Sequence, residues 1–213
     1  FYRSMTGPEQ DHIVSAFAFE LGKVETPEVR CRALGHIRNV DAKLCDRVEE
    51  ALGMQGQAYS IPAAVEPIDM QPSPALSLLA KAWPTLQGRK IGVLISEGYE
   101  LAIVDQLQAF AEAEGAVLEL IGPHIGEIRS NSHIAIKPHH AIAGAPSVFF
   151  DSVVLAVSAE GVGIFRQQAA ALNFIRDAFA HLKIIGFTAA SMPLLDTAGI
   201  DIDDGIVEVE TSE

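Results

Sequence analysis

The chain has 213 residues, of which 49% are hydrophobic, and its 28 acidic and 15 basic residues give a net charge of −13. The length indicates one domain or one domain plus an appendage, with enough apolar residues for a sizeable core. The acidic balance argues against phosphate-rich partners, so we expect neither nucleic-acid binding nor attachment to an anionic membrane surface.

Both cysteines, Cys31 and Cys45, lie in helical patterns among charged residues. Such a pair does not make a disulfide framework, so we expect a reducing compartment and a cytoplasmic protein. No apolar run reaches the roughly 18 residues that a transmembrane helix needs. The first residues, FYRSMTGPEQ, have neither an initiator Met nor a signal-peptide pattern, and we interpret the chain as part of a longer protein.

Residues 1–53 have the pattern of three helices. Thr6 and Glu9 have the spacing of a capping box, and Thr26-Pro27 is a typical start for a second helix. A third helix is predicted after Asn39, ending at Gly53. The apolar faces are Ile13, Phe17, Leu21 and Val24 in the first helix, and Val40, Leu44, Val48 and Leu52 in the third. Three short helices cannot bury these faces alone, so we expect them to dock on another part of a longer chain or on another subunit.

Residues 54–88 have the composition of a linker. Prolines recur at positions 62, 67, 72, 74 and 84, among Gln, Ser and Ala. Proline breaks helices and favours extended chain. A short helix over 75–83 is the one regular element that we predict within it.

From residue 89 to residue 213 strand and helix patterns alternate. The predicted strands are 90–95, 116–121, 152–157, 184–187 and 206–209; the predicted helices are 100–114, about 165–181, and one opening at 190; a small hairpin covers 127–136. Strands that are apolar on both faces and separated by helices predict an α/β fold with a doubly wound parallel sheet.

Ligands bind beyond the carboxyl ends of the strands in such sheets, so the turn after each strand is a candidate site. After the strand 184–187 comes Thr188, followed by Ala189, Ala190 and Ser191. In many α/β enzymes this turn carries a nucleophile, which needs a base within hydrogen-bond reach. Thr188 has no adjacent base, and Ser191 has the position of a capping or packing residue. We therefore favour a tight structural turn over an acyl-transfer site.

Three further candidates are each more simply explained by structure. The stretch EGVGIF (160–165) has two glycines before a predicted helix, but it matches neither common phosphate-binding motif. His124, His133, His139 and His140, with Glu127, lack the spacing of a metal site. Glu97 and Glu100 flank the first turn; paired carboxylates can do acid–base work, but most such pairs are solvated.

Two resemblances carry more information. The segments FYRSMTGPEQDHIVSAFAFELGKVE and VRCRALGHIRNVDAKLCDRVEEALG resemble the end of the helical domain of haem catalases. Residues 88–209 resemble the ThiJ/PfpI-type flavodoxin-like fold, which is related to class I glutamine amidotransferases. GRKIGVLISEGYE and KPHHAIAGAPSVFFDSVVL are similar to the domain appended to large-subunit catalases in particular. The order of helices (1–53), Pro-rich linker (54–88) and appended domain (89–213) is also that of large-subunit catalases.

The resemblance implies which chemistry is missing. Active ThiJ/PfpI proteins have a reactive Cys where this chain has Thr188, a degenerate nucleophile position, and a Glu near Ile103, where Glu100 is the only nearby carboxylate. In catalases the haem ligands lie in a barrel region that precedes these helices, and Tyr2, Tyr59 and Tyr99 are outside the ligand motif. We therefore expect no catalytic, cofactor-binding or metal-binding residue in this chain.

By resemblance, the parent protein disproportionates hydrogen peroxide with haem and is a homotetramer. This chain would then contact the rest of the catalase chain and identical subunits, and would serve stability, subunit assembly and haem access. Two alternatives stay open. One is a small hydrolase or glyoxalase-like enzyme of the ThiJ/PfpI type, which the residue at Thr188 disfavours. The other is a chaperone-like binding module that uses exposed apolar helix faces, including Phe17 and Leu44.

Overall fold

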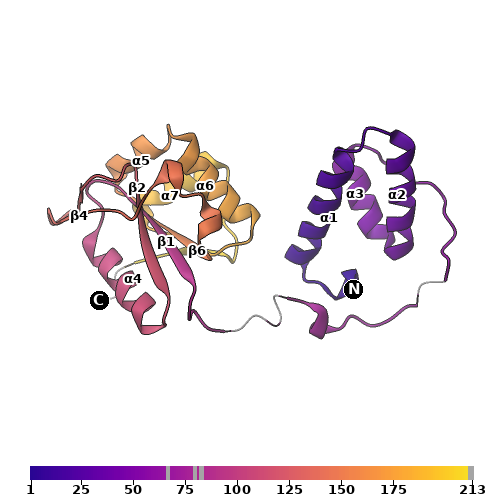
Figure 1. The fold of residues 1–213 in the computed structure, drawn as a ribbon, viewed down its shortest axis with the longest axis horizontal. Coiled ribbons are helices and arrows are strands. Elements are labelled where there is room, and N and C mark those ends of the chain that lie inside the picture. The colour runs from indigo at the N-terminus through magenta and orange to yellow at the C-terminus, as the bar shows by residue number, and fades with distance from the viewer. Residues whose placement is uncertain (66–67, 79–80, 82–83, 211–213) are drawn as a thin grey trace. The chain divides into compact units, whose positions relative to one another are not determined.

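The computed structural model describes residues 1–65, 68–78, 81 and 84–210. The chain divides into two compact units, Phe1–Trp83 and Pro84–Glu213. The first contains helices and irregular chain, and the second contains the parallel sheet with its helices (Figure 1). No helix among the described residues is long and apolar enough to cross a membrane.

The first unit opens with a short 3₁₀ turn, η1 (Tyr2–Ser4), and three helices, α1 (Gly7–Gly22), α2 (Pro27–Val40) and α3 (Ala42–Leu52). The predicted start signals are confirmed: Glu9 accepts from the Thr6 amide at 2.8 Å, and α2 begins at Pro27. Gly53 ends α3 with φ of +67°, a conformation that favours glycine. The third helix starts later than predicted, because the Asp41 side chain accepts from the Leu44 amide at 3.1 Å and caps it.

The three helices enclose a small core of their own. Its buried members are Tyr2, Val14, Cys31, Leu34, Ile37, Leu44, Cys45, Val48 and Met54. Leu44 is 2% exposed, so it is not an open binding surface, and that part of the chaperone-like hypothesis is wrong. Val40 lies at the end of α2 and is exposed, not on the α3 face. The large apolar side chains that α1 leaves exposed are Phe17 and Phe19.

The chain after α3 turns back along the helices. Buried Glu49 accepts from the amides of Gly56 at 3.1 Å and Ala58 at 2.9 Å. The Asn39 side chain donates to the Ile61 carbonyl at 3.0 Å. Within the predicted short helix, the structure has a 3₁₀ turn, η2 (Pro74–Leu76), and residues 79–80 and 82–83 lie outside the described part.

The second unit is built on six parallel strands in the order β5-β2-β1-β6-β7-β8. Their bounds are β1 Lys90–Ile95, β2 Val117–Gly122, β5 His140–Ala141, β6 Ser152–Ala156, β7 Ile185–Phe187 and β8 Ile206–Glu208. A separate antiparallel hairpin, β3 (Ile128–Arg129) with β4 (Ala135–Ile136), confirms the predicted one. The α/β class and the parallel sheet are therefore confirmed, and β5 is an edge strand that the sequence pattern did not reveal.

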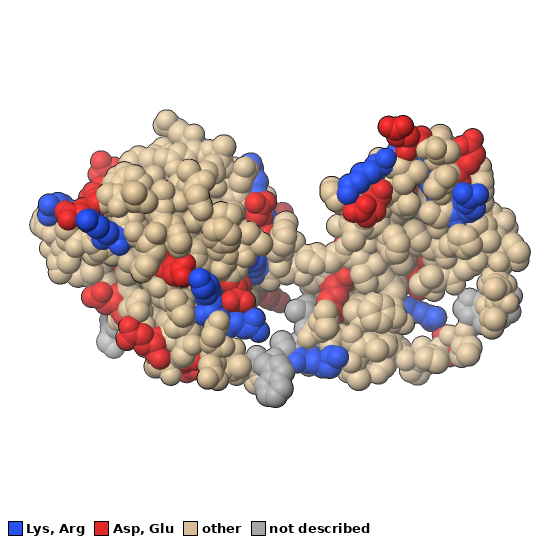
Figure 2. Space-filling model, in the orientation of Figure 1, with Lys and Arg blue, Asp and Glu red and all other residues tan. Residues whose placement is uncertain are grey.

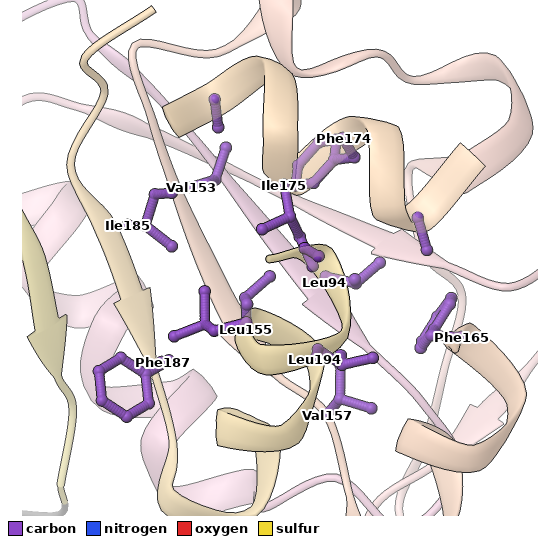
Figure 3. Close-up of a cluster of buried hydrophobic side chains, with 14 of the residues drawn as sticks. Leu94, Val153, Leu155, Val157, Phe165, Phe174, Ile175, Ile185, Phe187 and Leu194 are labelled. Carbon is purple, nitrogen blue, oxygen red and sulfur yellow. The ribbon is translucent and has the colours of Figure 1, made fainter. Parts of the chain in front are cut away.

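Helices cover both faces of the sheet. These helices are α4 (Leu101–Ala113), α5 (Ala159–Phe165), α6 (Ala169–Ala180) and α7 (Met192–Ala198). Successive strand residues point to opposite faces, so Val93 packs with α4 residues while Leu94 packs with residues of α5, α6 and α7. Figure 3 shows the hydrophobic cluster that contains Leu94. In it, Leu155 of β6, Phe174 of α6 and Leu194 of α7 converge.

Two predicted helical details are wrong. A helix begins at Ala159, before the predicted 165–181 segment, because the Ser158 hydroxyl accepts from the Gly161 amide at 3.1 Å and caps it. The spacing within 100–114 predicts one apolar face of Val104, Leu107, Phe110 and Ala111, but the Phe110 side chain is 66% exposed. The buried face of α4 instead runs through Ile103, Val104 and Ala111.

Candidate functional site

A hollow of about 770 Å³ lies at the carboxyl edge of the sheet. The residues around it lie at or after the carboxyl ends of β1, β6, β7 and β8: Gly98, Glu100, Ile103, Ala156, Val157, Ser158, Ala159, Thr188, Ala189, Ala190, Glu208, Val209 and Glu210, with Asn131 from the hairpin. The strand order reverses between β1 and β6, and open α/β sheets bind ligands at such a switch point. The structure therefore brings Thr188 and Glu100 to one cavity, as the strand pattern predicts.

Thr188 occupies the turn in an unstrained conformation. Its φ of −87° and ψ of 153° are ordinary extended backbone, unlike the left-handed turn that strains many nucleophile sites. The side chain is buried, and its hydroxyl oxygen lies 2.9 Å from the Ser191 hydroxyl and 3.4 Å from the Leu155 carbonyl. Among the described residues, these hydrogen-bond contacts of Thr188 include no His, Asp or Glu side chain.

Ser191 links this turn to the end of β6. Its buried hydroxyl accepts from the Val157 amide at 3.0 Å and donates to the Val157 carbonyl at 3.2 Å. The Ser191 hydroxyl therefore provides a hydrogen-bond partner for both the amide and the carbonyl of Val157, the residue after β6. The Thr188–Ser191 pair works as a structural tie between β6 and β7.

A second pair of hydroxyls ties β1 to β6. Ser96 and Ser158 have hydroxyl oxygens 3.0 Å apart, and the Ser158 hydroxyl donates to the Glu97 carbonyl at 2.6 Å. A Cβ on Gly161 would lie 2.0 Å from the Ser96 hydroxyl oxygen. The first glycine of EGVGIF is therefore required for close approach to Ser96. Sequence reasoning missed this pair, although both serines directly follow predicted strands.

The carboxylates of Glu97 and Glu100, which flank the turn after β1, have different surroundings. Glu97 turns to the hairpin, where its carboxylate accepts from the Arg129 amide at 3.0 Å. Glu100 lines the hollow together with Glu208 and Glu210, so three carboxylates border it. Ile103, the position near which the resemblance implies a Glu, also lines the hollow and is buried. An apolar side chain there supplies no acid or base to Thr188.

The histidine candidates do not meet at one point. His140 pairs with Glu119 at 2.8 Å, His139 accepts from the Leu120 amide at 2.8 Å, and His124 accepts from the Gly126 amide at 3.1 Å. His133 stands in a turn with φ of +61°. Within the part of the chain that the structure describes, no group of three His, Cys, Asp or Glu side chains is arranged to hold a metal.

The tyrosines do not fit a haem ligand role. The Tyr2 hydroxyl accepts from Arg47 at 3.2 Å, in a depression that is lined mostly by charged and polar residues. Tyr99 is fully buried in the cluster beneath α4, where burial and, less strongly, Asp105 raise its pKa. Tyr59 is half-exposed, and its amide bonds the Cys31 carbonyl.

Charged side chains on the surface are mixed. Figure 2 shows acidic side chains spread over the visible face, with Lys and Arg between them and no continuous basic patch on that face. This distribution gives no footprint for a nucleic-acid backbone on the face that is visible.

Comparison with known proteins gives the family. A family model described as the C-terminal domain found in long catalases matches residues 87–213, and one described as catalase-related immune-responsive matches residues 1–52. Because the first model covers more than half of the chain, the chain belongs to the family of C-terminal domains found in long catalases. The resemblance to the C-terminal part of large-subunit catalases is thus confirmed.

The sequence is similar to those of named catalases along nearly the whole chain. The chain is 42% identical to Catalase C of Rhizobium meliloti (strain 1021), over 98% of this chain and 30% of the relative. It is 34% identical to Catalase HPII of Mycobacterium avium, over 94% of this chain and 28% of the relative. Catalase-B of Dictyostelium discoideum is 30% identical over 97% of this chain and 30% of the relative. The chain therefore spans about 30% of the length of these relatives.

Proposed function

We propose that this chain is the non-catalytic C-terminal region of a long catalase. The parent would disproportionate hydrogen peroxide to water and oxygen with haem, which would be bound by residues outside this chain. One observation carries the proposal: Thr188, at the turn where related folds hold a nucleophile, has its hydroxyl engaged by Ser191 and Leu155. The matches to the C-terminal 30% or so of named catalases support the parent's identity.

We also propose the finer assignments that the resemblance implies. The sheet unit would be a ThiJ/PfpI-type flavodoxin-like domain over 89–213, after catalase helices at 1–53 and a linker at 54–88. Its roles would be stability, subunit assembly and control of haem access in a cytoplasmic homotetramer. The strand order and the hollow at the switch point support the fold assignment.

The test begins with the native protein. Its intact mass and absorption spectrum should show a polypeptide much longer than 213 residues that carries a Soret band. Deleting residues 84–213 in that longer protein should keep peroxide turnover per haem and lower the temperature of inactivation. A native chain of this length without haem would overturn the proposal.

The enzyme alternative makes a different prediction. A ThiJ/PfpI-type hydrolase or glyoxalase-like activity would depend on the Thr188 hydroxyl and would be lost in Thr188→Val. We expect no such turnover in the unsubstituted chain or in Thr188→Val. The binding alternative rests on Phe17 and Phe19, which are 39% and 66% exposed. It predicts that Phe19→Ser weakens suppression of a client protein's aggregation while the helical fold is retained.

A further inference from the structure

The Pro-rich segment returns to the beginning of the chain within the first unit. Arg3 donates to Asp69 at 2.8 Å, and the Ser73 amide donates to the Ser4 hydroxyl at 2.9 Å. These partners are 66 and 69 residues apart in sequence. Residues 69–78, which we name the strap, therefore lie along the start of α1.

Glu9 is the centre of this attachment. One carboxylate oxygen accepts from the Ser77 hydroxyl at 2.8 Å, and the other accepts from the Leu78 amide at 2.6 Å. The same carboxylate accepts from the Thr6 amide at 2.8 Å and the Thr6 hydroxyl at 2.9 Å. One side chain thus both caps α1 and holds the strap.

The hydrogen bonds around the Glu9 carboxylate indicate that it binds the strap in its ionised form. Its pKa is lowered to about 2, first by the Thr6 amide and then by the Ser77 and Thr6 hydroxyls and the Leu78 amide. Hydrogen bonds to an ionised acceptor are stronger than neutral ones. Ser77 is only 2% exposed, while the Leu76 and Leu78 side chains on either side are 42% and 75% exposed. The strap is therefore held by a polar contact and not by burial of its apolar side chains.

We propose that Glu9 is a latch that fixes the strap to α1 and so sets the length of chain between the helical unit and the sheet unit. With the strap attached, 12 residue steps separate Leu78 from Lys90, the first residue of β1. At the full extension of a peptide these span at most about 40 Å. When the Glu9 contacts are lost, the next attachment is Ser73, 17 steps from Lys90, and the limit rises to about 60 Å. This inference does not depend on the proposed function.

The latch is tested first by amide hydrogen exchange on the 213-residue chain at neutral pH. The Leu78 amide should be protected, and Glu9→Gln should lower its protection roughly ten- to a hundredfold, because a charged acceptor is lost. Ser77→Ala removes one strap bond and leaves the Thr6 contacts intact, so it should lower protection in the strap but not in α1. The matched control is Glu20→Gln; the Glu20 carboxylate accepts from Lys23, the residue that follows α1.

Two results would overturn the latch. One is a Leu78 amide that exchanges in the unsubstituted chain as fast as in an unstructured peptide. The other is unchanged protection in both Glu9→Gln and Ser77→Ala, with the Val14 amide of α1 still protected as a check on folding.

The spacing part of the inference has its own readout. Small-angle scattering should show a larger maximum dimension for Ser77→Ala and Glu9→Gln than for the unsubstituted chain and Glu20→Gln. Loss of strap protection without any change in maximum dimension would refute the role in spacing. Chymotrypsin cleavage after Leu76 or Leu78 should rise in the same variants.

Discussion

The hydroxyl oxygens of Thr188 and Ser191 lie 2.9 Å apart in the turn that follows β7. Ser191 also bonds the amide and the carbonyl of Val157, so this short contact connects the ends of two parallel strands. A nucleophile must be free to approach a substrate and must contact a base, and this pair does neither. The same geometry predicts how each hydroxyl contributes to stability.

Ser191→Ala should destabilise the sheet unit more than Thr188→Val does. Removing the Ser191 hydroxyl leaves two buried backbone groups of Val157 without this partner, at a cost of about 2–3 kcal/mol. Thr188→Val keeps the shape of the side chain and should cost about 1 kcal/mol, since Ser191 retains its Val157 bonds. Urea unfolding monitored by circular dichroism gives both values. Equal losses, or a larger loss for Thr188→Val, would contradict the tie.

The two glycines of α5 should respond oppositely to alanine. At Gly161 a Cβ would lie 2.0 Å from the Ser96 hydroxyl, whereas at Gly163 nothing lies within 4 Å. Gly161→Ala should therefore cost more than about 2 kcal/mol through overpacking. Gly163→Ala should be neutral or stabilise by up to about 1 kcal/mol, because alanine favours helix. Thermal unfolding of the two variants makes the comparison, and equal effects would show that Ser96 imposes no constraint.

Glu49 should be the most sensitive acidic residue of the helical unit. It is 3% exposed, and its carboxylate accepts from Arg38 at 3.2 Å as well as from the Gly56 and Ala58 amides. Glu49→Leu should cost about 2 kcal/mol, because it removes the acceptor of two part-buried backbone amides and of Arg38. The exposed neighbour Glu50 provides the matched control, and Glu50→Leu should change stability by less than about 0.5 kcal/mol. Chemical unfolding of the chain measures both.

Glu119 should give the sheet unit part of its pH dependence. Its carboxylate bonds Lys90 and His140, each at 2.8 Å, and first Lys90 and then His140 hold its pKa below the usual 4.5. A lowered pKa in the folded state means that the stabilisation is fully present above about pH 4.5 and is lost as the pH falls through the folded value. Glu119→Gln should therefore lower stability at pH 6 and flatten its decline towards pH 3. An unaltered pH profile, with exposed Glu127→Gln as the reference, would exclude this contribution.

Local signals in the sequence predicted the beginnings and ends of most elements. Thr6 with Glu9, Thr26-Pro27 and Gly53 mark helix boundaries that depend on neighbours within a few residues. The apolar strands predicted the parallel sheet, since residues buried on both faces leave no alternating pattern. β5, with two residues, has too few positions to form any pattern. The start of α5 was missed because its cap, Ser158, was read as part of a possible binding turn.

The sequence by itself determined the class of fold, the edge of the sheet where a site would lie, and the absence of a usual nucleophile at Thr188. These follow from periodicity and residue type, which act over a few positions. Only the tertiary structure decided three contacts. The Thr188 hydroxyl contacts Ser191, which in turn bonds the Val157 amide. Gly161 leaves room for the Ser96 side chain, and the Glu9 carboxylate accepts from Ser77. Ser96 and Gly161, like Glu9 and Ser77, are more than 60 positions apart in the chain. Contacts over such separations depend on how whole elements pack, and no local pattern encodes them.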